Sequence, residues 1–101
     1  CPNNVLVVCA GWKGKFNLED TLYAGALVER IQNTVKPACD APLAAGHLYR
    51  AAKDDMLSFL KNSSHVQRLA RLGIEKDIAF CLTPDKYDLL PILRDGSLQP
   101  A

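Results

Sequence analysis

No two of the four cysteines in this 101-residue chain form a C-x-x-C pair, the spacing typical of zinc and thioredoxin-like redox sites. The chain also lacks an apolar run of the roughly 18 to 20 residues that a membrane-spanning helix needs. Its formal net charge is only +1, which gives no clustered basic face of the kind that binds nucleic acid. We therefore expect no thiolate metal centre, no membrane contact and no nucleic-acid partner.

Other absences concern targeting and redox state. No basic leader precedes a long apolar stretch, so we expect no signal peptide. Cys9 and Cys81 lie in apolar runs, where free cysteine behaves as a small buried hydrophobe. We therefore expect reduced thiols and a cytoplasmic protein. The chain begins Cys1-Pro2 instead of with methionine, and on this ground we expect a part of a longer polypeptide.

The composition is that of an ordinary globular protein, with 49% hydrophobic and 23% charged residues in a length that suits one domain. Hydrophobic spacing and turn residues predict, in order, a buried strand at Val5–Cys9, a helix from about Leu18 to Asn33, a helix from about Ala41 to Leu60, a short helix from Ser64, a strand at about Ile78 to Leu82, an extended stretch at Leu89 to Leu93 and a hairpin turn at Asp95-Gly96. This order predicts an α/β fold with a three-layer α/β/α arrangement. Because so few strands are present, we expect an incomplete part of a larger fold.

The stretch after the first predicted strand has the features of an anion-binding loop. Gly11 and Gly14 allow positive φ and close backbone approach. Asn17 can cap the following helix, and Asp20, three residues on, can reach back to it. A strand, a glycine loop and a helix N-terminus in this order can present free backbone N–H groups to an anion.

Charged residues of both signs flank this loop. Lys13 and Lys15 add two cations, although the spacing matches neither a Walker A motif nor a dinucleotide fingerprint, and a surface turn with solvated lysines has the same pattern. Glu19 and Asp20 are adjacent acids that suit Mg²⁺ beside a phosphate; alternatively, they favour the positive end of the helix dipole. A nucleophilic role for Cys9 is a weaker alternative.

Three segments resemble the 2-phosphosulfolactate phosphatases: Val7-Val8-Cys9-Ala10-Gly11, Phe16-x-Leu18-Glu19-Asp20 and Ala24-Gly25-Ala26. Later similarity lies at Leu72-Gly73-Ile74-x-x-Asp77-Ile78-Ala79-Phe80-Cys81 and at Pro91-x-Leu93-x-Asp95-Gly96. The resemblance covers nearly all of the chain, and it matches the C-terminal half of that family's proteins. Residues 1–101 are therefore expected to be the C-terminal part of such a phosphatase domain.

The resemblance implies a Mg²⁺-dependent hydrolase that removes phosphate from a small sulfonated or carboxylated hydroxy acid, in coenzyme M biosynthesis. It implies a small phosphate ester and the N-terminal portion of the same protein as partners, and it leaves a homo-oligomer open. Glu19 and Asp20 are the expected catalytic and metal-binding residues. The expected substrate-binding residues are Gly11, Lys13, Gly14, Lys15 and Asn17.

Two other functions remain compatible with the same residues. A non-catalytic anion-binding or assembly module of a larger α/β protein would use the glycine loop without needing the two acids. A structural half-domain would leave the site to be built by the rest of the protein.

Overall fold

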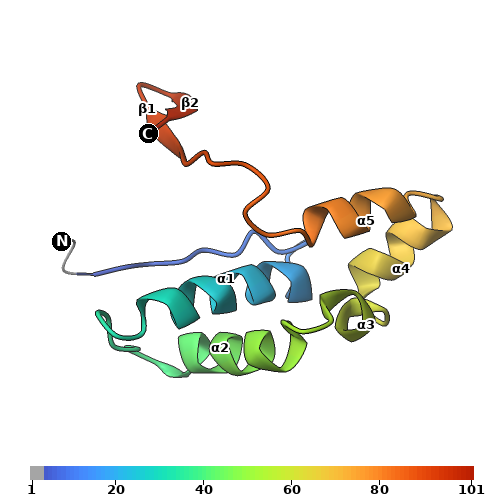
Figure 1. Cartoon of the computed structure of the whole chain (residues 1–101), viewed down its shortest axis with the longest axis horizontal. Helices are drawn as coiled ribbons and strands as arrows, with labels where there is room; N and C mark the ends of the chain where they lie inside the picture. Colours follow the sequence, from blue (N-terminus) through green and yellow to red (C-terminus); the bar gives the residue numbers. More distant parts are fainter. Residues whose placement is uncertain (1–3) are drawn as a thin grey trace.

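The structure is a computed structural model that describes residues 4–101. Its elements, in chain order, are α1 (Leu18–Ile31), α2 (Asp40–Ala52), α3 (Met56–Leu60), α4 (Ser64–Arg71), α5 (Glu75–Cys81), β1 (Pro91–Arg94) and β2 (Ser97–Pro100). Figure 1 shows α1 and α2 side by side and antiparallel, with α3, α4 and α5 gathered at one end of this pair. The strands β1 and β2 stand away from the helices.

The first predicted helix is confirmed, and the second is divided. The Asn17 side chain caps α1 by accepting a hydrogen bond from the Asp20 N–H, as expected. The single helix predicted over residues 41–60 is wrong, because the chain breaks between α2 and α3. Asp55 causes this break, since its carboxylate accepts from the Ser58 N–H at 3.1 Å and starts a new helix.

The ends of α4 follow from local chemistry. Ser63, rather than the predicted Ser64, is the N-cap, and its hydroxyl accepts from the Val66 N–H at 3.2 Å. At the other end Gly73 has a φ of 72°, and the Ile74 N–H donates to the Leu69 carbonyl at 3.0 Å. This left-handed glycine stop was predicted from the sequence and is confirmed.

Replacing Ser63 by alanine should destabilise the protein by about 1 to 2 kcal/mol, because it removes the cap of α4 and a second hydrogen bond to Glu19. The matched control is Ser64→Ala, an exposed residue one position later, which should change stability by less than about 0.5 kcal/mol. Chemical denaturation of both variants measures the difference. Equal losses would contradict the assignment of the cap to Ser63.

The strand predicted at about Ile78 to Leu82 is wrong, since most of this run belongs to helix α5. A short apolar run cannot be assigned from periodicity alone. Two features favour a helix here: Glu75 and Asp77 lie in its first turn, and Ile78 and Leu82 are four residues apart on one face. That face packs against the core, where Ile78 is buried.

The predicted strand at Val5–Cys9 is also not found as a buried strand. No β-ladder includes it within the described chain, and its side chains are exposed, with Leu6 at 87% and Val8 at 78%. A β-strand is stabilised by hydrogen bonds to a neighbouring strand, and no strand within residues 4–101 pairs with this segment. Its apolar composition therefore does not lead to burial here.

The predicted C-terminal hairpin is confirmed. The antiparallel strands β1 and β2 pair with Ile92 opposite Gln99, around a turn in which Asp95 and Gly96 have φ values of 50° and 77°. In the described residues the secondary structure is thus five helices and one two-stranded sheet, a small α/β arrangement. The three-layer α/β/α arrangement is not confirmed.

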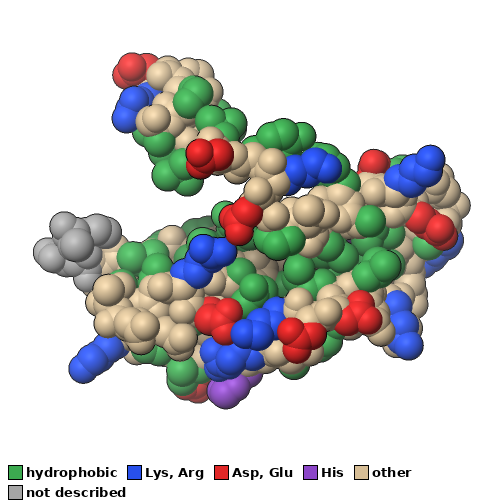
Figure 2. Space-filling view, in the orientation of Figure 1, with side chains coloured by type: hydrophobic (Ala, Val, Ile, Leu, Met, Phe, Trp, Pro, Cys, Tyr) green, Lys and Arg blue, Asp and Glu red, His purple; other side chains and the backbone are tan. Residues whose placement is uncertain are grey.

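The core is small and draws on every helix. It is formed by one buried side chain from each of the five, namely Leu22, Ala52, Leu60, Val66 and Ile78. Charged side chains lie along the lower edge in Figure 2, over α1 and α2, and hydrophobic side chains occupy the middle of the same view. None of the helices in residues 4–101 is both long and apolar enough to cross a membrane.

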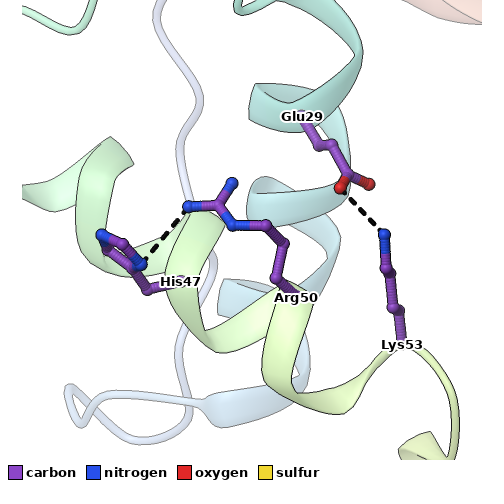
Figure 3. A network of polar contacts seen from close by, with 4 residues as sticks. All are labelled: Glu29, His47, Arg50 and Lys53. Atoms are coloured by element: carbon purple, nitrogen blue, oxygen red, sulfur yellow. Dashed lines mark hydrogen bonds and ion pairs between the residues drawn. The ribbon is translucent and has the colours of Figure 1, made fainter.

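The contact between α1 and α2 depends on a single glycine. A Cβ built on Gly25 would meet the carbonyl oxygen of Ala45 and would lie 2.7 Å from Tyr49 Cβ. The small-residue patch at residues 24–26 therefore allows the close approach predicted from the sequence, and helix α2 is the neighbour. Lys53, which follows α2, also contacts α1, since its Nζ lies 3.1 Å from Glu29 Oε1 (Figure 3).

Candidate functional site

The glycine loop folds as a tight reverse turn. The Trp12 N–H donates to the Lys15 carbonyl at 3.0 Å, and the Lys15 N–H donates to the Trp12 carbonyl at 2.9 Å. The two central residues, Lys13 and Gly14, have φ values of 50° and 73°, as a type I′ turn requires. The turn exposes both lysine side chains and leaves the N–H groups of Lys13 and Gly14 without a partner in the described residues.

Gly11 has the positive φ predicted for it, but its N–H has a partner inside the protein. Its φ is 70°, and a Cβ at this position would lie 2.7 Å from the Lys15 carbonyl oxygen. Its N–H donates to Asp20 Oδ2 at 2.8 Å. Three of the five N–H groups at residues 11–15 are therefore used internally, which leaves fewer to hold an anion than the sequence pattern suggests.

The Asp20 carboxylate joins this loop to the start of α1. The sequence predicted that Asp20 would reach back to the capping residue; instead its side chain holds Gly11, while its own N–H donates to Asn17 Oδ1 at 3.2 Å. Asn17 thus acts as the helix cap in this structure. The turn is exposed, whereas four positions that flank it in the sequence are half-buried, namely Gly11, Asn17, Glu19 and Asp20.

Glu19 connects the same helix turn to α4. Its Oε1 accepts a hydrogen bond from Ser63 Oγ at 2.6 Å, a contact between residues 44 apart in the sequence. Because the same hydroxyl caps α4, the start of that helix is held against the first turn of α1. This contact could not be predicted from the sequence, since no local signal relates the two segments.

A second contact places α4 beside the glycine turn. The Arg68 guanidinium carbon lies 4.2 Å from the centre of the Trp12 ring, and Lys13 Nζ lies 5.8 Å from the same ring. Arg68 Nη2 also lies 2.5 Å from His65 Nδ1. Sequence reasoning missed Arg68. The only local signal was its spacing of three residues from Arg71.

The two acids fit a hard cation only in part. Within residues 4–101 each carboxylate accepts one hydrogen bond, which leaves the other oxygen of Glu19 and of Asp20 without a donor. Mg²⁺ is commonly bound through one or two carboxylates, with waters and substrate phosphates as its other ligands. However, the described chain contains no group of three His, Cys, Asp or Glu side chains that could hold a metal ion. These residues therefore supply ligands for such an ion but no complete cage.

The remaining candidates lie outside this cluster or show no chemical partner. Three cysteines, Cys9, Cys39 and Cys81, are exposed and form no disulfide with one another, so the expected burial of Cys9 and Cys81 is wrong, and the reduced state stays a prediction. Cys1 lies outside the described residues. His47 is an exposed residue of α2 that lies 3.3 Å from Arg50 Nη2 (Figure 3).

Comparison with known proteins identifies relatives for most of this chain. The family model described as 2-phosphosulpholactate phosphatase matches residues 1–96. A protein of Caldanaerobacter subterraneus subsp. tengcongensis named "Probable 2-phosphosulfolactate phosphatase" is 38% identical over 94 residues, covering 92% of this chain and 39% of its own length. A protein of the same name from Thermotoga petrophila is 40% identical over 93 residues, with 92% and 40% covered. This chain thus spans about two fifths of the length of these curated relatives.

Proposed function

Since this chain belongs to the 2-phosphosulpholactate phosphatase family, we propose that the protein containing it hydrolyses a phosphate monoester of a small sulfonated or carboxylated hydroxy acid. The observation that supports this most is the joining of the glycine turn to the two acids, through the hydrogen bond from Gly11 to Asp20. It puts exposed cations, unpaired backbone N–H groups and carboxylates at one place. Those are the groups that phosphate-ester hydrolysis needs.

The phosphate oxygens are proposed to bind at the glycine turn. Their partners there are the side chains of Lys13 and Lys15 and the unpaired N–H groups of Lys13 and Gly14. The positive charge of these partners stabilises the negative charge that develops as water attacks phosphorus. A new P–O bond then forms to the water oxygen, while the bond from phosphorus to the ester oxygen breaks. The products are inorganic phosphate and the free hydroxy acid.

Glu19 and Asp20 are proposed to hold Mg²⁺ through their second oxygens. When bound, this ion would supply positive charge to the phosphate and increase the acidity of the attacking water. One of the two carboxylates accepts the proton that this water loses and passes it to the departing ester oxygen. Asn17 and Gly11 position these groups by fixing the first turn of α1 against the glycine turn.

We further propose that the N-terminal portion of the same protein completes the site. The two acids do not form a complete set of metal ligands in the described residues, and the chain spans about two fifths of its relatives. The cytoplasmic location, the link to coenzyme M biosynthesis and the oligomeric state stay predictions.

Phosphate release from 2-phosphosulfolactate by the purified full-length protein that contains this chain tests this function. We expect equal amounts of phosphate and sulfolactate, a loss of at least about hundredfold in rate with EDTA, and recovery with excess Mg²⁺. Release that EDTA does not change would contradict the metal assignment. Absence of release would contradict the phosphatase function, and phosphate binding that is equally strong with and without Mg²⁺ would then indicate a non-catalytic anion-binding module.

A further inference from the structure

A hollow in the surface of α4 lies beside the proposed site. It has a volume of about 390 Å³ and is lined by Ser64, Arg68, Arg71 and Leu72. Helix α4 starts next to Ser63, whose hydroxyl is bonded to Glu19, and Arg68 stacks on Trp12 at the edge of the glycine turn. The hollow therefore adjoins both the acids and the loop, although none of its lining residues belongs to either.

The charge of this hollow is not balanced within the described chain. Arg68 and Arg71 are three residues apart and so lie on one side of the helix, where two like charges repel each other. The ion pairs of residues 4–101 are Arg30–Asp85 and Lys53–Glu29, and neither arginine takes part in one. Cations in the last turn of a helix do favour its dipole, but this role explains neither the hollow nor the stacking on Trp12.

The chemistry of the hollow suits a small, strongly acidic group. Each guanidinium presents its N–H donors in a planar fork that matches neighbouring oxygens of an oxyanion, and the Ser64 hydroxyl adds one more donor. A 2-phosphosulfolactate molecule carries two acidic groups besides its phosphate, a sulfonate and a carboxylate. The sulfonate has three oxygens and is negatively charged throughout the working pH range.

We propose that Arg68 and Arg71 bind the sulfonate of the substrate while its phosphate lies at the glycine turn. This inference rests on the proposed function and adds to it the residues that would select a sulfonated hydroxy acid. Arg68 is held by its stacking on Trp12. Arg71 is exposed, and its Nε donates to the Gln67 carbonyl at 3.4 Å within its own helix, so its charge is free to meet a ligand.

The test compares Arg71→Gln with the unmodified protein on two substrates. For 2-phosphosulfolactate, KM should rise about tenfold with kcat unchanged within twofold, because a charge-assisted contact to a non-reacting group is lost. For 2-phospholactate, which keeps the carboxylate and lacks the sulfonate, KM should not change. The matched control is Arg50→Gln, which removes the same charge from an exposed arginine of α2 (Figure 3) and should affect neither substrate.

Equal increases in KM for both substrates would overturn the assignment to the sulfonate, as would an equal effect of Arg50→Gln. A separate measurement keeps the inference testable if no hydrolysis is found. Calorimetric titration with sulfolactate should show binding that Arg71→Gln weakens about tenfold and Arg50→Gln leaves unchanged. No binding, or binding that Arg71→Gln does not weaken, would overturn the inference independently of catalysis.

Discussion

Replacing Gly25 by alanine should destabilise the protein by about 2 kcal/mol. The added methyl group would meet the Ala45 carbonyl group and Tyr49 Cβ across the contact of α1 with α2. These atoms belong to the backbone or to the root of a side chain, so the two helices would have to move apart. Overpacking of this kind costs about 1 to 3 kcal/mol and sometimes more, against a gain of about 1 kcal/mol in helix propensity.

Gly46→Ala is the matched control for that experiment, because Gly46 is also a buried helical glycine in the same pair of helices. A Cβ there would lie 3.3 Å from Arg50 Nη1, the far end of a flexible side chain, and 3.5 Å from Val28 Cγ1. We expect this variant to be as stable as the unmodified protein or to gain up to about 1 kcal/mol. Denaturant unfolding of both variants gives the comparison, and a tolerated Gly25→Ala would show that the helices do not pack this closely.

Removing the charge of Glu19 and Asp20 should reduce the proposed Mg²⁺-dependent phosphatase activity of the full-length protein by at least about hundredfold. The double variant Glu19→Gln, Asp20→Asn is suited to this test, because an amide oxygen can still accept the hydrogen bonds from Ser63 and Gly11. Its stability should therefore change by less than about 1 kcal/mol. Phosphate release measured across a range of Mg²⁺ concentrations, together with an unfolding curve, separates the two effects.

Glu29→Gln is the control for this charge removal. Glu29 lies on the same helix and loses the same charge, but it is near the opposite end of α1, and its partner is Lys53 (Figure 3). We expect unchanged activity, and little change in stability because exposed ion pairs contribute about 0 to 1 kcal/mol. Mg²⁺-dependent activity that survives in the double variant would show that the catalytic carboxylates lie elsewhere.

The sequence was sufficient to predict helix caps and turns, because these features depend on residues that are close together along the chain. Asn17 was predicted as the cap of α1, Gly73 as the left-handed stop of α4 and Asp95-Gly96 as the turn of the hairpin, and all three are confirmed. In each case the stabilising hydrogen bond or the positive φ belongs to residues a few positions apart. The tertiary environment has little influence on such features.

Reasoning from the sequence failed for two apolar runs, because no cap or turn residue nearby indicates their secondary structure. Val5–Cys9 was predicted as a buried strand and is exposed, because a strand requires a neighbour and the described residues provide none. Most of the run from Ile78 is part of helix α5. The buried Ile78 and the partly buried Leu82 are four positions apart and share one helix face, whereas a half-buried strand would bury every second residue. An apolar run indicates which residues are candidates for burial, but it does not show whether they are buried in a strand or in a helix.

The sequence by itself determined the family, the positive φ of Gly11 and Gly14 and the capped start of α1 with its two acids. Only the tertiary structure decided what those acids touch: Asp20 holds Gly11, and Glu19 holds Ser63 and thereby brings α4 and Arg68 to the same place. The physical reason is that a cap or a turn is closed by adjacent residues. A hydrogen bond between residues 44 positions apart forms only after the helices have packed.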